Sequence, residues 1–170
     1  MLTGVLCGLV GAAAADDRIE VVAAEGVELP APVVDDPRFS QRRVPRRPGV
    51  VHYGLELPRL VAATAPTPDV VFSVTHGPIR SRVPLALMVQ DLSFEHRPEA
   101  DPRATRLRLR SAVRAQVRQA AGVLTVSEHA RQDLIATYGT DPARVHHVPN
   151  AALAPPSLTD AERTAAVRSL

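Results

Sequence analysis

The stretch GVLTVSEHARQDLIATYG, residues 122–139, contains a complete strand-and-helix unit. Its first five residues form a short apolar run that ends at a turn, which is typical of a strand buried on both faces of a parallel sheet. Ser127 stands where a helix N-cap is expected, and Gly139 stands where a left-handed residue closes a helix. A buried strand that leads directly into a capped helix predicts the repeating unit of an α/β fold.

The same alternation of apolar runs and helical patterns continues along the rest of the chain. Further strands are expected over 18–26, 69–74, 85–91 and 144–150, and further helices over 2–15, 50–64, 103–120 and from near Thr159. The runs at 69–74 and 85–91 are also predicted to be buried on both faces. Pro58 is expected to kink the second of these helices or end it early. Proline breaks and paired arginines predict an irregular surface loop over 27–48. The predicted fold class is α/β with a parallel sheet and flanking helices.

The composition is that of an ordinary globular protein. The chain has 170 residues, of which 45% are hydrophobic and 22% are charged, enough for one domain with a full core. Aromatic residues make up only 3%, so the core must come from alanine, valine and leucine. All basic residues are arginine, but the net charge of only +2 does not by itself imply nucleic-acid binding. The single cysteine, Cys7, excludes an internal disulfide and a cysteine-based zinc site.

The first fifteen residues look at first like a secretory signal. Residues 2–15 are a short apolar run followed by small residues, but the first basic residue is Arg18, so the positive n-region is missing. The run is also too short to span a bilayer. A helix with one buried stripe is the preferred interpretation, and the expected location is cytoplasmic. The stripe recurs at spacings of three and four and consists of Leu2, Leu6, Leu9, Val10 and Ala13.

Polar side chains gather where the predicted strands end. In a parallel α/β sheet the ligand crevice lies outside the carboxyl ends of the strands. The residues at these ends are His76, Gly77, Gln90, Asp91, Ser93, Phe94, Ser127, Glu128 and Asn150. We therefore expect these residues to line a binding crevice. Adjacent His146 and His147 would face opposite sides of a strand, so they cannot both bind one metal ion from one face. The sequence predicts no metal site and no cofactor.

Three segments, in order, resemble one known family. VQDLSFEHRPE (89–99), AGVLTVSEHARQDLIATYG (121–139) and DPARVHHVPNAA (141–152) resemble the N-terminal half of family 4 glycosyltransferases of the GT-B type. Members typically read HDLSF, then VSEFSRRDL, then VPNGVD. The resemblance implies a Rossmann-like acceptor-binding domain, a second domain that binds the nucleotide, and transfer of a hexose from a nucleotide sugar with retention of configuration.

The chain departs from the family pattern in four places. The family begins with a strand and a glycine-rich turn, whereas this chain opens inside the helix that follows them. The donor domain would begin after residue 160, and the chain ends at Leu170; Gln90 replaces the family histidine and Ala151 the family glycine. We therefore expect residues 1–156 to be a GT-B half-domain that lacks its first strand, and 157–170 to be a linker and helix leading to an absent donor domain. Such a chain is a gene fragment, a split subunit or the product of a misassigned start.

A missing first strand has consequences for stability and activity. The strands over 18–26 and 69–74 must then either pair directly or leave open edges, which favours marginal stability or association. Catalysis in a two-domain cleft needs both walls, so the chain alone is expected to have little or no transferase activity. The alternative functions are a non-enzymatic binding module and a subunit of a split enzyme.

Several of the predicted site residues also have a purely structural interpretation. Asp91, the expected catalytic residue, can accept a hydrogen bond from an acceptor hydroxyl or can close its own loop in an Asx-turn. Gln90 can hydrogen-bond an acceptor but does not titrate. Its presence in place of the family histidine removes the group at this position that could shuttle a proton near neutral pH. Ser127 and Glu128 can line the crevice or cap the helix, and His76 can point into the crevice or pack.

Arginines form a stripe on the predicted helix over 103–120. They recur at spacings of three and four beside an apolar face, and are Arg103, Arg106, Arg110, Arg114 and Arg118. The stripe is either a solvated face or a contact for anionic membrane headgroups, which would suit a lipid-linked acceptor. Nucleic acid is not an expected partner, because stacking aromatics are almost absent. The expected partners are a sugar or lipid-linked acceptor, a nucleotide sugar only with a donor domain, and an anionic membrane.

Overall fold

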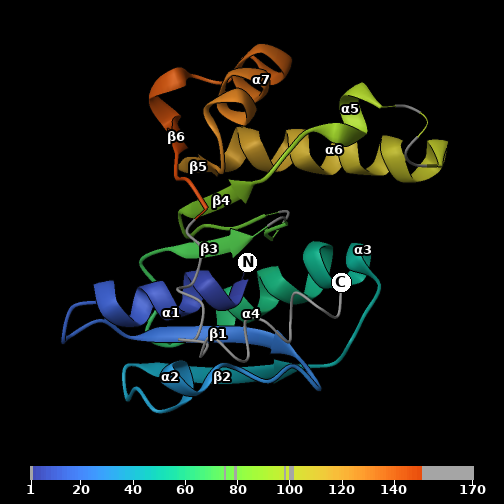
Figure 1. Ribbon diagram of the computed structural model, residues 1–170. Coiled ribbons are helices and arrows are strands. Elements are labelled where there is room, and N and C mark those ends of the chain that lie inside the picture. The colour runs from blue at the N-terminus through green and yellow to red at the C-terminus, as the bar shows by residue number, and fades with distance from the viewer. Residues whose placement is uncertain (1, 75, 79, 98, 100–101, 151–170) are drawn as a thin grey trace, which may run out of the picture.

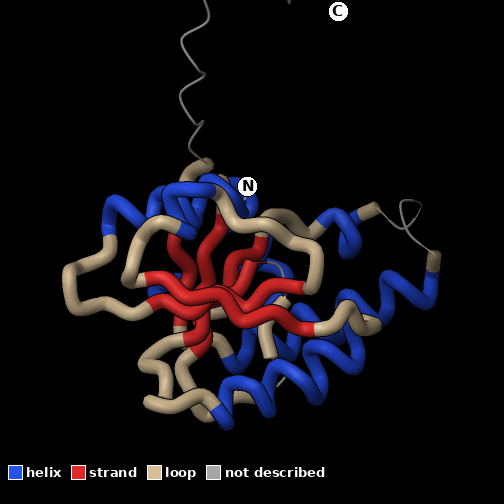
Figure 2. The backbone as a smooth tube through the Cα atoms, turned by 90° about the horizontal axis from the view of Figure 1, so that it is seen from below, coloured by secondary structure: helices blue, strands red, loops and turns tan. Residues whose placement is uncertain are grey.

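The computed structural model describes residues 2–74, 76–78, 80–97, 99 and 102–150, and these form an α/β fold of parallel strands and flanking helices (Figure 1). The strands are β1 (Ile19–Ala24), β2 (Phe39–Val44), β3 (Val71–Val74), β4 (Leu85–Val89), β5 (Gly122–Thr125) and β6 (Val145–His147). The helices are α1 (Leu2–Ala12), α2 (Ala31–Val34), α3 (Gly49–Val51), α4 (Leu57–Ala63), α5 (Ser93–His96), α6 (Arg103–Gln119) and α7 (Glu128–Tyr138). Seen from below, the strands occupy the middle and the helices lie around them (Figure 2). The predicted Rossmann-like α/β class is confirmed.

The larger sheet holds the hydrophobic core. Its strand order is β3-β4-β5-β6, and every pair is parallel. Leu87 on β4, Val123 on β5 and Leu134 on α7 are each 0% exposed, and Val117 on α6 is 1% exposed. The predicted strands over 85–91 and 122–126 are therefore confirmed, and so is the long helix over 103–120. β4 and β5 are buried because they are the central strands, covered by helices.

A buried glutamine fastens α6 to the loop after β3. Gln116 is 1% exposed, and its amide bonds both backbone groups of one residue. Its Oε1 accepts from the Gly77 N–H at 3.2 Å, and its Nε2 donates to the Gly77 C=O at 2.9 Å. Gln119 donates to the C=O of the next residue, Pro78, at 2.7 Å. These bonds satisfy a stretch of buried, irregular backbone that otherwise has no sheet partner.

Residues 27–48 are not the irregular loop that the sequence predicted. They contain α2 and the whole of β2, which pairs in parallel with β1 from Ile19↔Phe39 to Ala24↔Val44. The strand was missed because its sequence, FSQRRV, is mostly polar. One of its polar side chains bonds the neighbouring strand: Arg42 Nε donates to Glu20 Oε1 of β1 at 2.8 Å. Cross-strand ion pairs can stabilise a strand whose sequence is too polar for the strand to be predicted.

The two sheets are separate, and β1 does not pair with β3. Of the two outcomes expected for these strands, direct pairing does not occur, and among the described residues no other strand pairs with the free side of β1 or β3. The prediction that residues 69–74 are buried on both faces is wrong, because β3 contains no buried residue. Phe72 on this strand is 38% exposed and Val70, just before it, is 54% exposed.

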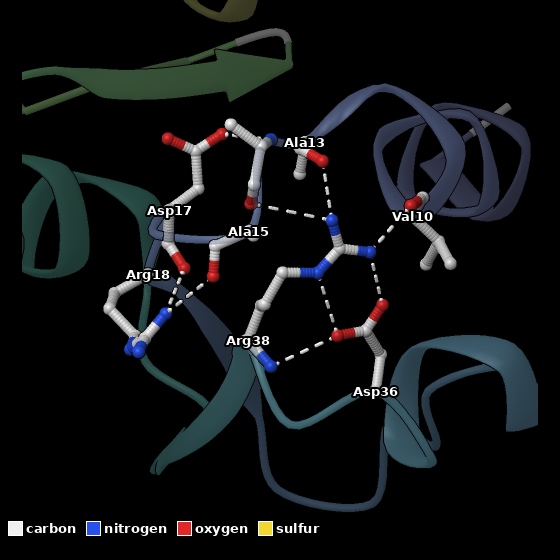
Figure 3. Close-up of polar contacts among 8 residues, drawn as sticks. Val10, Ala13, Ala15, Asp17, Arg18, Asp36 and Arg38 are labelled. Carbon is white, nitrogen blue, oxygen red and sulfur yellow. Dashed lines mark hydrogen bonds and ion pairs between the residues drawn. The ribbon is translucent and has the colours of Figure 1, made fainter.

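Arg38 closes the carboxyl end of α1 (Figure 3). Its guanidinium donates to the C=O of Val10 at 2.7 Å and also to the C=O of Ala13, where the last turn of a helix has no internal donors. The same guanidinium pairs with the Asp36 carboxylate at 2.5 Å, and this hydrogen bond lowers the pKa of Asp36 to about 2. The predicted helix over 2–15 is therefore confirmed as α1, and of its predicted stripe Leu6 is buried whereas Leu9, Val10 and Ala13 are partly exposed.

The helix predicted over 50–64 is present but contains a widened turn. Between α3 and α4 lies the π-helical turn η1 (His52–Glu56), and the whole segment runs on to Ala63. Pro58 sits in the first turn of α4, directly after η1. It therefore does not end the helix, because a wide turn just before it accommodates its missing N–H. The helix expected near Thr159 and the linker at 157–170 lie outside the described residues.

Gln116→Leu should destabilise the fold more than Gln119→Leu. The first change leaves the buried N–H and C=O of Gly77 unpaired, which should lower the free energy of unfolding by about 2–4 kcal/mol. The second removes one bond from an exposed side chain and should lower it by less than about 1 kcal/mol. Urea unfolding of both variants measures the difference. Equal losses would show that the Gln116 amide is not a special anchor.

Candidate functional site

The carboxyl ends of the four strands of the larger sheet lie along one edge. The pairs that end the ladders are Val74↔Met88, Val89↔Thr125 and Thr125↔His147. Because the strands are parallel, the residues that follow them emerge on the same side of the sheet. The topology thus brings together the loops that carry His76, Gln90 with Asp91, Ser127 and Asn150. The sequence placed these residues on the correct strand ends.

Asp91 closes an Asx-turn and remains exposed. Its Oδ1 accepts the backbone N–H of Ser93 at 2.8 Å. Hydrogen bonds from Ser93, first from the side chain and then from the backbone, lower the pKa of Asp91 below its ordinary value. At neutral pH the group is therefore an ionised, acceptor-only carboxylate on the surface of the sheet edge. Of the two interpretations, the structure shows the Asx-turn directly, and the exposed side chain can still meet a ligand.

The short helix that follows Asp91 is held in place at three points. Phe94 is buried in the core, so its ring anchors the loop from below. Glu95 pairs with Arg110 of α6 at 2.5 Å and accepts the Tyr138 hydroxyl at 3.0 Å. Burial and this bond to Glu95 raise the pKa of Tyr138. His96 meets Asp133 of α7 at 2.8 Å. The loop that carries Asp91, Gln90 and Ser93 is thus fixed to two helices.

Ser127 and Glu128 form the amino end of α7. Ser127 Oγ accepts the Ala130 N–H at 3.0 Å, which is the predicted N-cap. Glu128 accepts from Arg131 at 3.1 Å and is exposed. Gly139 closes the helix at φ 63°, in the left-handed region that was predicted for it. The capping interpretation is therefore confirmed for Ser127, whereas Glu128 bonds the side chains of Arg131 and Gln132 in its own helix.

The remaining strand end is open to solvent. His146, His147 and Asn150 are all exposed on or just after β6, the outer strand of the sheet. The two histidines were expected to face opposite sides, and an edge position leaves both uncovered. Among residues 2–150, apart from the few positions not described, no group of three histidine, cysteine or acidic side chains could hold a metal ion.

His76 lies in an aromatic cluster that bridges two elements. Its ring stacks on Tyr53 at 5.3 Å between centroids, and Tyr53 also meets the ring of His52 edge-on at 5.0 Å. His52 Nδ1 lies 2.7 Å from Glu56 Oε2 within the same widened turn. Burial, and secondly the charge of Arg108, lower the pKa of His76. The ring is therefore neutral and half-buried at physiological pH.

The glycine after His76 is required by packing. A Cβ at Gly77 would lie 2.9 Å from Cδ1 of Leu85, which is closer than real Cβ atoms come. Gly77 is also the residue that Gln116 binds through both backbone groups. Its role is therefore to let the chain turn tightly against the core and to fix the direction in which His76 leaves β3.

Sequence reasoning missed His52, Tyr53 and Glu56. The spacing of His52 and Glu56 on a predicted helix is a signal that could have been used, since such pairs meet on one face. The contact between Tyr53 and His76 could not have been predicted in this way, because it depends on how η1 approaches the segment after β3 in space. The π-helical turn borders the candidate site, because Tyr53 within it stacks on His76.

Two surface hollows in the described part of the chain lie away from this edge. One, of about 540 Å³, is lined by Ala15, Pro32 and the residues 35–38. The other, of about 620 Å³, lies between α4 and residues 80–83. None of the predicted site residues lines either hollow. Neither hollow therefore belongs to the candidate site.

Two comparisons with known proteins bear on this site. The family model described as Glycosyltransferase Family 4 matches residues 9–152, which is most of the chain. The match contains every predicted site residue. A comparison with curated proteins found no match.

His76 should titrate below its ordinary pKa of 6.5. The folded state favours the neutral ring, so the stability that this group contributes is present above pH 6.5 and is lost as pH falls. Tyr53→Ala uncovers the ring and should raise the pKa, and Arg108→Gln should raise it less, because the charge is the second cause. NMR titration of the ring protons measures both changes, with Arg103→Gln as the control. A pKa at or above 6.5 in the unchanged protein would contradict the burial of this ring.

Proposed function

Since the chain belongs to glycosyltransferase family 4, we propose that it is the acceptor-binding half of a hexosyltransferase. In this proposal a sugar passes from a nucleotide-sugar donor to a hydroxyl of the acceptor, with retention of configuration. The donor is held by a separate nucleotide-binding domain. One observation carries the proposal: the family match spans a parallel sheet whose carboxyl edge presents an exposed, ionised carboxylate, Asp91.

In the proposed complex, Asp91 accepts a hydrogen bond from the reacting hydroxyl of the acceptor. The anchored α5 supports this role, since a fixed loop loses little freedom when it positions a ligand. Gln90, Ser93 and Ser127 are further polar groups on the same edge, and the neutral ring of His76 borders them. Gly77, Phe94, Glu128 and Asn150 complete the proposed acceptor site, with Gly77 and Phe94 acting through their packing.

The proposed location is cytoplasmic, with contact to an anionic membrane through α6. Arg103 and Arg114 on this helix are exposed, whereas Arg110 is paired with Glu95. Exposed guanidinium groups attract anionic headgroups, and this suits a lipid-linked acceptor. The proposed contact uses Arg103, Arg106, Arg110 and Arg114. In the part of the chain that the structure describes, no helix is long and apolar enough to cross a membrane.

Binding to immobilised sugars and lipid-linked saccharides tests the proposed function. Acceptor binding should depend on Asp91. Asp91→Ala should therefore abolish binding to every immobilised saccharide that the unchanged chain binds. Asp16→Ala removes an exposed aspartate far from the sheet edge and serves as the matched control. Retention of no saccharide, or equal retention by both variants, would contradict an acceptor site at Asp91.

The chain alone should bind no nucleotide sugar tightly. The donor is expected to be held by another domain, so calorimetry with common nucleotide sugars should show no binding tighter than millimolar. Addition of the separate nucleotide-binding domain should restore binding. A micromolar dissociation constant for the chain alone would refute the assignment of this domain to the acceptor.

Vesicles containing anionic lipid should bind the chain at low salt through α6. The double change Arg103→Gln and Arg114→Gln should weaken binding by about 1 kcal/mol for each arginine. The double change Arg80→Gln and Arg82→Gln alters the net charge equally and should have a smaller effect. Sedimentation with the vesicles measures both. Equal weakening by the two pairs would leave α6 as an ordinary solvated face.

A further inference from the structure

The hollow between α4 and residues 80–83, called the α4 hollow below, lies at the amino edge of the larger sheet. Thr67, which precedes β3, and residues 80–83, which precede β4, line it together with α4. The two strands are parallel, and the Val71 N–H at the start of β3 donates to the Pro84 C=O at 2.8 Å. The predicted acceptor residues follow the strands at the opposite, carboxyl edge. The α4 hollow is therefore a separate place on the molecule.

One wall of the α4 hollow is apolar. Helix α4 contributes Pro58, Val61 and Ala62, and none of the residues of this helix is buried. Val83, from the facing segment, is 8% exposed. The hollow has a volume of about 620 Å³, which is within the range of small-molecule sites. An apolar group that enters it leaves water and gains contacts with this wall.

The other wall carries two positive charges. Arg80 and Arg82 both line the hollow and are exposed, and neither guanidinium has a hydrogen bond or an ion pair within the described part of the chain. Ser81, between them, shapes a local turn: its Oγ accepts the Val83 N–H at 3.0 Å and donates to the Val83 C=O at 3.0 Å. The described lining contains no acidic residue that would neutralise the two arginines.

The charges and the apolar wall together select a class of ligand. A phosphate monoester carries nearly two negative charges near neutral pH, which match two guanidinium groups, whereas a single carboxylate matches one. We propose that the α4 hollow binds a phosphate monoester with a short apolar group. The phosphate pairs with Arg80 and Arg82, and the apolar group packs on Val61 and Ala62. This inference does not depend on the proposed transfer reaction.

Hexyl phosphate is a direct probe because it contains both parts of the ligand. An NMR titration of the whole chain suits the millimolar affinity that is expected of so small a molecule. The amide signals of residues 61–62 and 80–83 should shift and reach saturation. Inorganic phosphate lacks the apolar group and hexanol lacks the charge, so each should bind more weakly by at least about tenfold. Hexanoate, with one charge, should also bind more weakly than hexyl phosphate.

Four variants at exposed positions test the two walls. Arg80→Gln and Arg82→Gln should each weaken binding of hexyl phosphate about tenfold, the effect of one charge-assisted hydrogen bond. Arg59→Gln, on α4 but outside the hollow, is the matched control and should leave binding unchanged. Ala62→Glu places a carboxylate in the hollow and should abolish binding, since it repels the phosphate. Urea unfolding of each variant verifies that the chain remains folded.

Ala63→Glu is the matched control for Ala62→Glu. It adds the same charge to the next residue of the same helix, which is also exposed but does not line the hollow. Binding of hexyl phosphate should therefore persist in this variant. Any general effect of a new carboxylate on α4 would appear in both variants, whereas a ligand in the hollow is lost only in the first.

Two sources can present a phosphate monoester: a soluble molecule and the lipid phosphatidic acid. Sedimentation with vesicles that contain phosphatidic acid distinguishes them. We expect a soluble ligand, so the pair Arg80→Gln and Arg82→Gln should reduce sedimentation less than the pair Arg103→Gln and Arg114→Gln. A larger reduction by the first pair would assign the α4 hollow to the lipid headgroup.

Three results would overturn the proposal. The first is an absence of saturable shifts with hexyl phosphate. The second is equal binding of hexyl phosphate and hexanol, which would show that the arginines recognise no phosphate. The third is an equal loss of binding in Ala62→Glu and Ala63→Glu, which would place the ligand outside the hollow.

Discussion

The bond pair between Gln116 and Gly77 fixes the geometry on which the candidate site depends. A buried irregular segment needs partners for its backbone, and here one side-chain amide supplies both. The end of β3 is thereby tied to α6, and Leu85 leaves room at this point only for glycine. His76 must then leave the strand toward Tyr53. A core contact thus decides the direction of a surface residue.

A second constraint is the pairing of strand backbones. The four-stranded sheet satisfies it at its centre, and there the side chains of β4 and β5 are buried. Where pairing stops, at β1 and β3, burial also stops, although the sequence is just as apolar. Arg38 holds α1 to the segment before β2 through helix-end carbonyls, which shows that the smaller sheet is tied together by charge and hydrogen bonds. Few fully buried apolar side chains stabilise it.

The sequence predicted those elements whose signals are local. The cap at Ser127, the closing Gly139 and the buried runs of β4 and β5 all depend on neighbouring residues, and all were confirmed. β2 was missed because FSQRRV is stabilised by a strand twenty residues away and not by its own apolar pattern. The burial of β3 was wrong for a related reason, since an apolar run does not reveal whether both of its sides find partners. The cluster of His52, Tyr53 and His76 depends likewise on contacts between distant segments.

The residues near Asp91 show how a surface carboxylate acquires a defined position. Its own hydrogen bond to Ser93 shapes only the turn. The direction of that turn is set further on, where Phe94 enters the core, Glu95 joins Arg110 to Tyr138, and His96 meets Asp133. Several of these groups are charged, and their ion pairs anchor α5 to α6 and α7. The Asp91 carboxylate takes no part in the contacts that anchor α5, and it is exposed. Contacts of the neighbouring residues therefore define the position of this carboxylate.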